Sequence, residues 1–138
     1  MSKRVLCCIL LFSASLMVGC LGDGRIDVAG SVSVDGTPVE HGSIMFIPIE
    51  ETPGPTAGAL IRGGTYEIVP GKGPMAGKFR VEILAVKETG KASIDIVTGE
   101  KGAGRAQFLP PRFNKESDVT VEISGDRDAY DFDLKLEK

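Results

Sequence analysis

The feature that most constrains the fold is an alternation of apolar and polar residues with a period of two. From Ile26 to Val34, apolar or small residues occupy every second position, as in a strand with one buried face and one wet face. A similar run from Tyr130 to Leu136 lies near the end of the chain. No segment after Ile26 carries the capped apolar stripe of an amphipathic helix. The pattern therefore predicts an all-β fold.

Turn signals divide the chain into short strands. Asp35-Gly36 and Gly63-Gly64 mark tight turns, and Pro70 to Gly77 forms a loop. Seven strands are predicted, over residues 26–34, 43–47, 57–62, 65–69, 78–87, 119–123 and 130–136. Residues 88–107 form the least regular region, in which only Ile94 to Val97 is expected to form a short strand. Short strands at this spacing indicate one antiparallel β-sandwich.

The beginning of the chain indicates export. Lys3 and Arg4 precede an uncharged run over residues 5–19, which is shorter than the roughly 20 apolar residues of a membrane-spanning helix. Cys20 follows this run directly. We expect three parts in the chain: a cleaved signal peptide (1–19), a short tether that begins at Cys20 (20–25) and one β-sandwich domain (26–138).

Composition excludes several kinds of site. Without residues 1–19, the chain has 14 basic and 19 acidic residues, a net charge of −5 that argues against a nucleic-acid partner. The two other cysteines, Cys7 and Cys8, leave with the signal peptide, so the domain is expected to contain no disulfide. His41 is the only histidine, which excludes a metal site built from histidine and cysteine. We expect no cofactor.

The segments Gly30 to Val39 and Gly42 to Pro48 resemble the opening of carboxypeptidase regulatory-like domains. Gly64-Thr65-Tyr66-Glu67-Ile68 and Gly77 to Ile83 resemble two later strand entries of the same family. The resemblance implies a transthyretin-like, prealbumin-type, seven-stranded Greek-key sandwich. The chain is similar overall to small single-domain lipoproteins that are abundant in planctomycete-like bacteria. In carboxypeptidases the equivalent domain is an accessory module, so the resemblance implies no catalytic residue.

The segment Leu16-Met17-Val18-Gly19-Cys20 resembles the lipobox of bacterial lipoproteins, with Met17 at a position that is usually leucine. The resemblance implies cleavage between Gly19 and Cys20, a diacylglyceryl group on the Cys20 thiol and acylation of the new amino end. We therefore expect a lipid anchor in a membrane of the bacterial envelope, with the outer membrane slightly favoured. An ordinary secretory signal is the alternative.

Two residues are candidates for nucleophilic chemistry. Ser43 lies in a predicted strand, and His41 lies in the preceding turn. Nucleophilic catalysis requires a serine beside a base, and no Gly-x-Ser-x-Gly segment is present. We expect a solvated histidine, a serine in a strand and no enzymatic activity, with a hydrolase as the less favoured alternative.

An acidic cluster near the last strand offers the oxygen ligands that calcium prefers, but its spacing fits no calcium loop. Its members are Asp126, Asp128, Asp131 and Asp133. The glycine-rich segments 71–73 and 99–105 open no helix, so we expect mobile loops there rather than phosphate sites.

Arg112, Phe113 and Asn114 follow two prolines and precede the strand predicted over 119–123. The aromatic ring is expected to anchor the long preceding loop onto the sandwich, with Asn114 in the turn. A contact surface is the alternative, because arginine and aromatic residues are enriched at interfaces.

The sequence therefore predicts a membrane-anchored, non-catalytic module that binds an envelope protein or a glycan through loops at the ends of the sandwich. A carrier of small ligands in a transthyretin-like dimer cavity is an alternative from another functional class.

Overall fold

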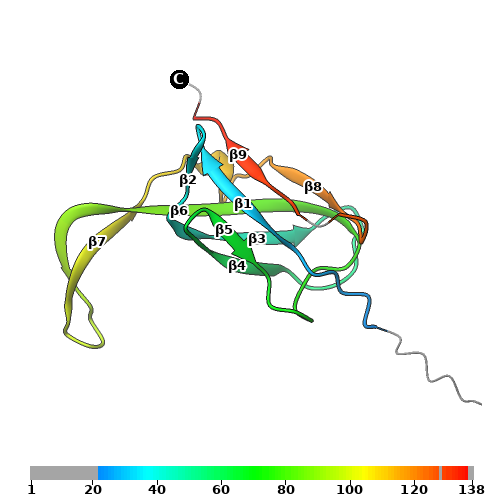
Figure 1. Cartoon of the computed structure of the whole chain (residues 1–138), viewed down its shortest axis with the longest axis horizontal. Helices are drawn as coiled ribbons and strands as arrows, with labels where there is room; N and C mark the ends of the chain where they lie inside the picture. The colour runs from blue at the N-terminus through cyan, green and yellow to red at the C-terminus, as the bar shows by residue number, and fades with distance from the viewer. Residues whose placement is uncertain (1–21, 128, 137–138) are drawn as a thin grey trace, which may run out of the picture.

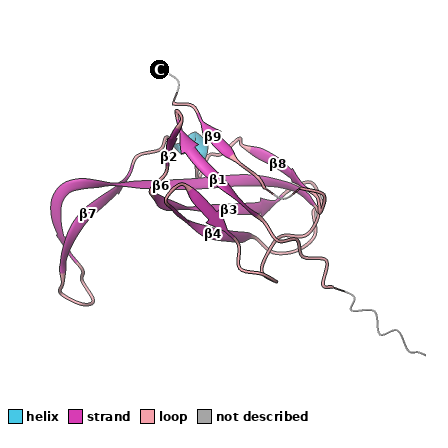
Figure 2. Ribbon diagram, in the orientation of Figure 1, coloured by secondary structure: helices cyan, strands magenta, loops and turns pink. Residues whose placement is uncertain are grey.

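The alternating segments form the strands of an all-β domain in the computed structural model, which describes residues 22–127 and 129–136 (Figures 1 and 2). The described residues form nine strands: β1 (Ala29–Val34), β2 (Thr37–Pro38), β3 (His41–Pro48), β4 (Ala57–Arg62), β5 (Thr65–Glu67), β6 (Gly77–Ile94), β7 (Lys101–Gln107), β8 (Thr120–Ile123) and β9 (Phe132–Leu134). A single turn of 3-10 helix, η1 (Pro111–Phe113), lies between β7 and β8. Within the described residues, no helix is long and apolar enough to span a bilayer. The prediction of an all-β fold is confirmed.

The strands form one connected sheet in the order β2-β1-β5-β4-β3-β6-β7, and β8 pairs with β6 while β9 pairs with β1. All pairings are antiparallel except that of β1 with β9, which is parallel. β3 lies between β4 and β6 over almost its whole length. Both edges of β3 are therefore paired, but only one of its faces is buried: Ile44 and Phe46 are fully buried, whereas Met45 between them is 38% exposed.

The core is aromatic at its centre. Phe46 on β3 is fully buried, and the centre of its ring lies 6.0 Å from that of Tyr66, 6.5 Å from that of Phe79 and 6.3 Å from that of Phe132. Aliphatic side chains from most of the strands surround this cluster: Val32, Ile44, Ile61, Val81, Ile83, Ile123 and Leu134. The apolar residues that the alternation predicts to face inward are thus the residues that are buried in the structure.

Two tyrosines fasten the C-terminal strand to the sheet. The hydroxyl of Tyr66 donates a hydrogen bond of 2.6 Å to the backbone oxygen of Tyr130, and the backbone N–H of Tyr130 donates to the oxygen of Ala29. The hydroxyl of Tyr130 bonds to the backbone N–H and oxygen of Ser124. Burial raises the pKa of the Tyr66 hydroxyl well above its usual value of 10.0.

The structure corrects the prediction for residues 88–107. This region is not irregular: β6 continues to Ile94 and pairs with β7, with a register shift between Glu88 and Ala92. The resulting hairpin extends away from the rest of the domain (Figure 1) and is called the arm here (residues 87–107). Ile96 and Val97 lie in its terminal turn rather than in a strand. Almost every residue of the arm is exposed. Its sequence therefore lacks the alternation of apolar and polar residues that marks a half-buried strand.

The acidic residues near the C-terminus hold β9 against β1. The carboxylate of Asp131 accepts hydrogen bonds from the backbone N–H and hydroxyl of Ser31, at 2.7 and 2.8 Å. Asp133 accepts one of 2.8 Å from the hydroxyl of Ser33 and one of 3.1 Å from the N–H of Gly36, and it forms an ion pair with Lys135. These carboxylates therefore join neighbouring strands.

Acid is expected to weaken this junction. The hydrogen bonds from Lys135, Ser33 and Gly36 lower the pKa of Asp133 from 3.8 to about 2. Because the pKa is lower in the folded chain, the stabilisation is present above pH 4 and is lost as the pH falls from about 4 to 2. Asp133→Asn should lower the urea midpoint at pH 7 and reduce the further loss between pH 5 and 2, measured by circular dichroism. An equal loss in both proteins over that interval would contradict the role of Asp133.

Candidate functional site

The side chains of the candidate site come from the outer face of the central strands. On β3, Ile44 and Phe46 point into the core, so His41, Ser43 and Met45 lie on the opposite face. The register places Arg62 of β4 and Val86 of β6 on either side of His41. It likewise places Leu60 and Leu84 on either side of Ser43.

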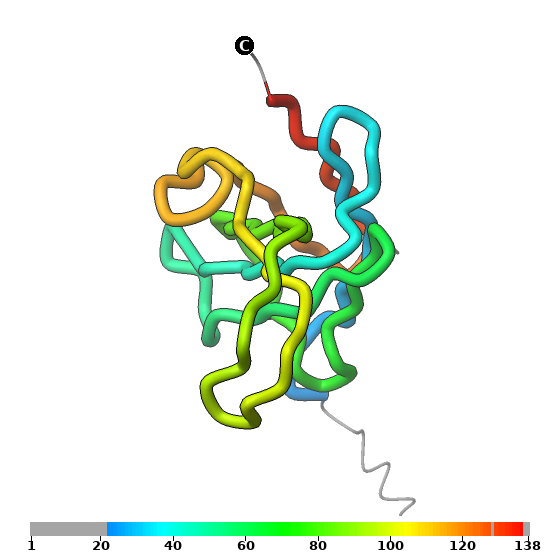
Figure 3. The backbone as a smooth tube through the Cα atoms, turned by 90° about the vertical axis from the view of Figure 1, so that its left-hand side faces the viewer, coloured from blue at the N-terminus to red at the C-terminus, as the bar shows by residue number. Residues whose placement is uncertain are grey.

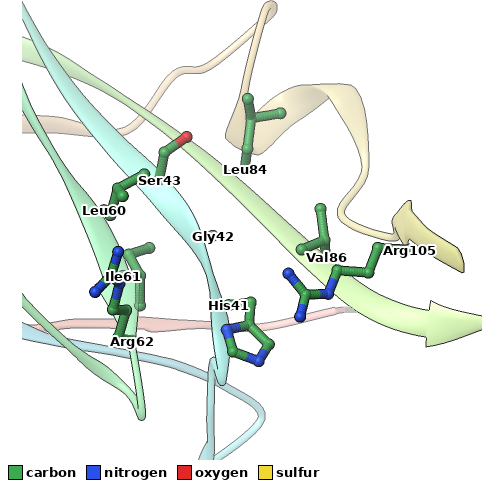
Figure 4. Close-up of a pocket in the computed structure, with 9 residues that line it drawn as sticks. All are labelled: His41, Gly42, Ser43, Leu60, Ile61, Arg62, Leu84, Val86 and Arg105. Carbon is green, nitrogen blue, oxygen red and sulfur yellow. The ribbon is translucent and has the colours of Figure 1, made fainter. Parts of the chain in front are cut away.

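These residues line a depression of about 340 Å³ at the base of the arm (Figure 4). Its side chains include His41, Ser43, Leu60, Arg62, Leu84, Val86 and Arg105. Arg105, which β7 contributes, extends its guanidinium group toward His41 in Figure 4. Neither Arg62 nor Arg105 takes part in an ion pair within residues 22–127 and 129–136. Two guanidinium groups therefore face one depression in a chain whose net charge is −3.

A second depression of about 220 Å³ shares Ser43 and Leu84 with the first. It adds Met45 from β3, Glu82 from β6, and Asn114 and Lys115 from the segment after η1. We call the two together the outer-face groove. Three of its apolar side chains are partly exposed, namely Leu60 at 61%, Leu84 at 40% and Met45 at 38%.

The outer-face groove combines charge with an apolar floor. A guanidinium group donates parallel hydrogen bonds to a carboxylate or phosphate, and it loses less hydration than an ammonium group does. The leucines and Met45 can cover the hydrocarbon part of the same ligand. This arrangement suits a ligand that carries an acidic group beside an apolar one.

Ser43 and His41 are two residues apart on the same face of β3, a separation of about 7 Å along a strand. No hydrogen bond joins the Ser43 hydroxyl to the His41 ring in the part of the chain that the structure describes. The groove thus presents both groups to a ligand without pairing them as a nucleophile and a base.

The predicted anchor residues hold the segment between β7 and β8. Phe113 is buried in the core, and Asn114 is buried with its amide nitrogen 3.1 Å from the oxygen of Pro110. The amide oxygen of Asn114 accepts a hydrogen bond from the N–H of Lys115. Arg112 donates to the backbone oxygen of Lys135 at 2.9 Å, and its guanidinium lies 4.9 Å from the centre of the Phe113 ring. These contacts fit an anchoring role, and Asn114 also borders the outer-face groove.

The other residues singled out in the sequence are dispersed. Among the described residues, no three histidine, cysteine, aspartate or glutamate side chains gather as metal ligands. Asp126 bonds to the Ser124 hydroxyl, whereas Asp128 lies outside the described residues. Gly73 packs against the backbone of Ile26. Residues 99–105 form the end of the arm and most of β7. The predicted cleavage and lipidation positions, Gly19 and Cys20, also lie outside the described residues.

Sequence reasoning did not find Arg62 and Arg105 as candidates. They are far apart in the sequence and are brought together only by the pairing of β3 with β4, of β3 with β6 and of β6 with β7. One signal was available: Leu84 and Val86 continue the outer face of β6 after Arg80 and Glu82. Apolar residues on a solvent-facing strand surface indicate a contact site.

Comparison with family models, with curated protein sequences and with solved structures found no match for the chain. The resemblance to carboxypeptidase regulatory-like domains therefore stays a prediction.

Proposed function

We propose that this chain is a lipid-anchored, non-catalytic binding module of the bacterial envelope. In this proposal the strands form a transthyretin-like Greek-key sandwich, Cys20 carries the acyl chains and the outer-face groove holds an acidic segment of another envelope protein. The observation that carries the binding role is the pair of guanidinium groups, Arg62 and Arg105, that face one partly apolar groove without ion-pair partners among the described residues.

The start of the domain supports a short tether. Arg25 pairs with Met75 and bonds to the oxygen of Gly73, and the N–H of Ile26 donates to Pro74. Only residues 21–24 then separate Cys20 from Arg25. Five residue steps span at most about 18 Å. An acylated Cys20 would hold the domain directly against its membrane, and two or three acyl chains give stable anchoring.

The lining of the outer-face groove favours a peptide over a glycan. Its apolar lining comes from aliphatic side chains and Met45, and no phenylalanine, tyrosine or tryptophan lines it. Sugar rings commonly stack on flat aromatic side chains, whereas aliphatic floors cover peptide side chains. Arg62, Arg105 and Lys115 supply positive charge for aspartate or glutamate side chains or for a terminal carboxylate.

Cys20→Ser is expected to move the protein from the membrane fraction to the soluble fraction, because the thiol that receives the diacylglyceryl group is lost. Cell fractionation and mass spectrometry of the mature amino end measure the change. Cys8→Ser is the matched control and should leave the protein in the membrane fraction. Unchanged fractionation of Cys20→Ser would overturn the anchor.

The double variant Arg62→Glu/Arg105→Glu is expected to lose the partner bound in the groove. Reversing two charges that face an acidic ligand replaces attraction by repulsion, so crosslinking should fall at least tenfold. The measurement is crosslinking in cells followed by mass spectrometry, with the membrane-anchored wild type as reference. Lys72→Glu reverses an exposed charge on the loop between β5 and β6, away from the groove, and should change little. Equal crosslinking in all three proteins, or capture of a glycan alone, would contradict the proposed peptide site.

A further inference from the structure

The arm ends in an apolar turn that nothing in the domain covers. Ile96 is 99% exposed, Val97 is 93% exposed and Ile94 is 62% exposed. These are the three most exposed large aliphatic side chains of the arm, and they lie within four residues of one another. Isolated exposed aliphatic residues are common, but a group of them at the end of a projecting hairpin indicates a contact site.

The turn itself is well defined. The Asp95 carboxylate accepts hydrogen bonds of 2.8 and 2.9 Å from the N–H groups of Val97 and Thr98. The N–H of Asp95 donates to the oxygen of Glu100, and that of Gly99 donates to the oxygen of Asp95. These bonds occupy the polar backbone of the turn, which leaves the side chains of Ile96 and Val97 projecting outward. Because these backbone groups already have hydrogen-bond partners, moving the turn out of water into an apolar environment costs less free energy.

The terminal turn of the arm lies on the same side of the molecule as the start of the described chain (Figure 1). In Figure 1 the end of the arm lies at the lower left, the described chain begins at the lower right and the C-terminus lies at the top. Figure 3, turned about the vertical axis, also shows the arm and the N-terminal end at the lower side. Cys20 is two residues before Gly22, at most about 7 Å away along the chain. The end of the arm and the start of the described chain thus lie at opposite ends of the long axis but on the same lower side (Figures 1 and 3), so one flat membrane surface can meet both.

Charge separates the arm from the rest of the domain. Residues 87–107 contain four basic residues (Lys87, Lys91, Lys101 and Arg105) and three acidic ones (Glu88, Asp95 and Glu100), so the net charge of the arm is +1. The remainder of the chain from Cys20 onward therefore has a net charge of −6. A membrane surface that contains anionic lipids repels the body of the domain, whereas around the terminal turn the charges of Lys91 and Lys101 balance those of Asp95 and Glu100.

We infer that the terminal turn of the arm inserts Ile96 and Val97 into the surface of the membrane that carries the lipid anchor. The inference rests on the proposed anchoring through Cys20. The bilayer is favoured over a second copy of the chain because the turn points to the same side as the tether and carries two adjacent, almost fully exposed aliphatic side chains. With both contacts made, the domain stands on the membrane at two points, which fixes the direction in which the outer-face groove opens.

The absence of tryptophan from the chain provides a direct test. Val97→Trp places a single indole in the terminal turn of the full-length, processed protein, which is reconstituted into vesicles of phosphatidylethanolamine and phosphatidylglycerol. The expected results are a blue-shifted emission, protection from iodide and quenching by lipids that carry bromine on their acyl chains. Thr37→Trp is the matched control, because β2 lies at the opposite, upper side of the molecule in Figure 1. Its indole should stay accessible to iodide.

The outcomes separate the two proposals. If the protein remains on the vesicles and the indole of Val97→Trp is as accessible to iodide as that of Thr37→Trp, the membrane contact of the arm is overturned and the anchor stands. If Cys20→Ser stays bound to membranes as well as the wild type, the anchor is overturned. A blue shift in detergent without vesicles that grows with protein concentration would show contact between copies of the chain and would also overturn insertion.

Discussion

Phe46→Ala is expected to lower the free energy of unfolding by about 3–5 kcal/mol, the range for removing a buried aromatic ring. Phe46 is fully buried on the central strand β3, and its ring packs against Tyr66, Phe79 and Phe132 from three other parts of the chain. The alanine leaves a cavity that these rigid neighbours cannot fill. Because small domains are stable by only about 5–15 kcal/mol, this one change removes a large share of the total.

Urea unfolding followed by circular dichroism measures the loss. Phe46→Leu keeps part of the volume and should cost clearly less than the alanine variant. Val69→Ala, at a loop position that is 65% exposed, should stay within about 0.5 kcal/mol of the wild type. A loss of less than 1 kcal/mol for Phe46→Ala would show that these four rings do not form the centre of the core.

Gly30→Ala is expected to cost about 1–3 kcal/mol, the range for an overpacked site, because β1 passes too close to the C-terminal segment for a side chain. A Cβ atom on Gly30 would lie 2.0 Å from the backbone oxygen of Tyr130 and 3.1 Å from the ring of Tyr66. That oxygen accepts the buried hydrogen bond from the Tyr66 hydroxyl. The methyl group therefore pushes apart two segments that the hydrogen bond holds together.

Two measurements identify the cause of this loss. Urea unfolding gives the stability, and ultraviolet difference titration gives the pKa of Tyr66, which should move down toward its ordinary value as the hydroxyl becomes hydrated. Gly102→Ala is the control on β7, where a Cβ would meet no atom within 4 Å. If Gly30→Ala is as stable as Gly102→Ala, there is room in solution for a methyl group between β1 and the backbone of Tyr130, which would contradict the close approach.

The two proposed membrane contacts together would set the orientation of the outer-face groove relative to the membrane. A domain held at Cys20 and at the end of the arm cannot rotate freely about its tether, so the groove faces a fixed direction above the membrane. An acidic partner segment would then bind without the entropic cost of first orienting the domain. The base of the arm contributes Arg105 to the groove, so in these two proposals the same hairpin would make both contacts.

Most of the strands could be predicted because their burial is one-sided. Val32 and Val34 on β1, and Ile44 and Phe46 on β3, occupy inward positions that the alternation already marks. The seven predicted strands correspond to β1, β3, β4, β5, β6, β8 and β9. The two-residue β2 was not predicted, because Pro38 within it reads as part of a turn.

The arm and the outer-face groove could not be predicted in the same way. Both faces of the arm are exposed from Lys87 to Lys101, so its two strands are defined by their mutual hydrogen bonds and not by burial. His41, Arg62 and Arg105 are separated in the sequence by 21 and 43 residues, and no local pattern links them. Their common position follows from the register of three strand pairs.

The sequence by itself determined the fold class, through the alternation from Ile26 onward, and it predicts the anchor, through the apolar run that ends at Cys20. Both are local properties, because each depends on neighbouring residues along the chain. Only the tertiary structure decided that β6 continues into a projecting arm, and that two arginines face one groove. The physical reason is that strand pairing over long sequence distances sets which side chains share a surface, and composition and periodicity do not encode that register.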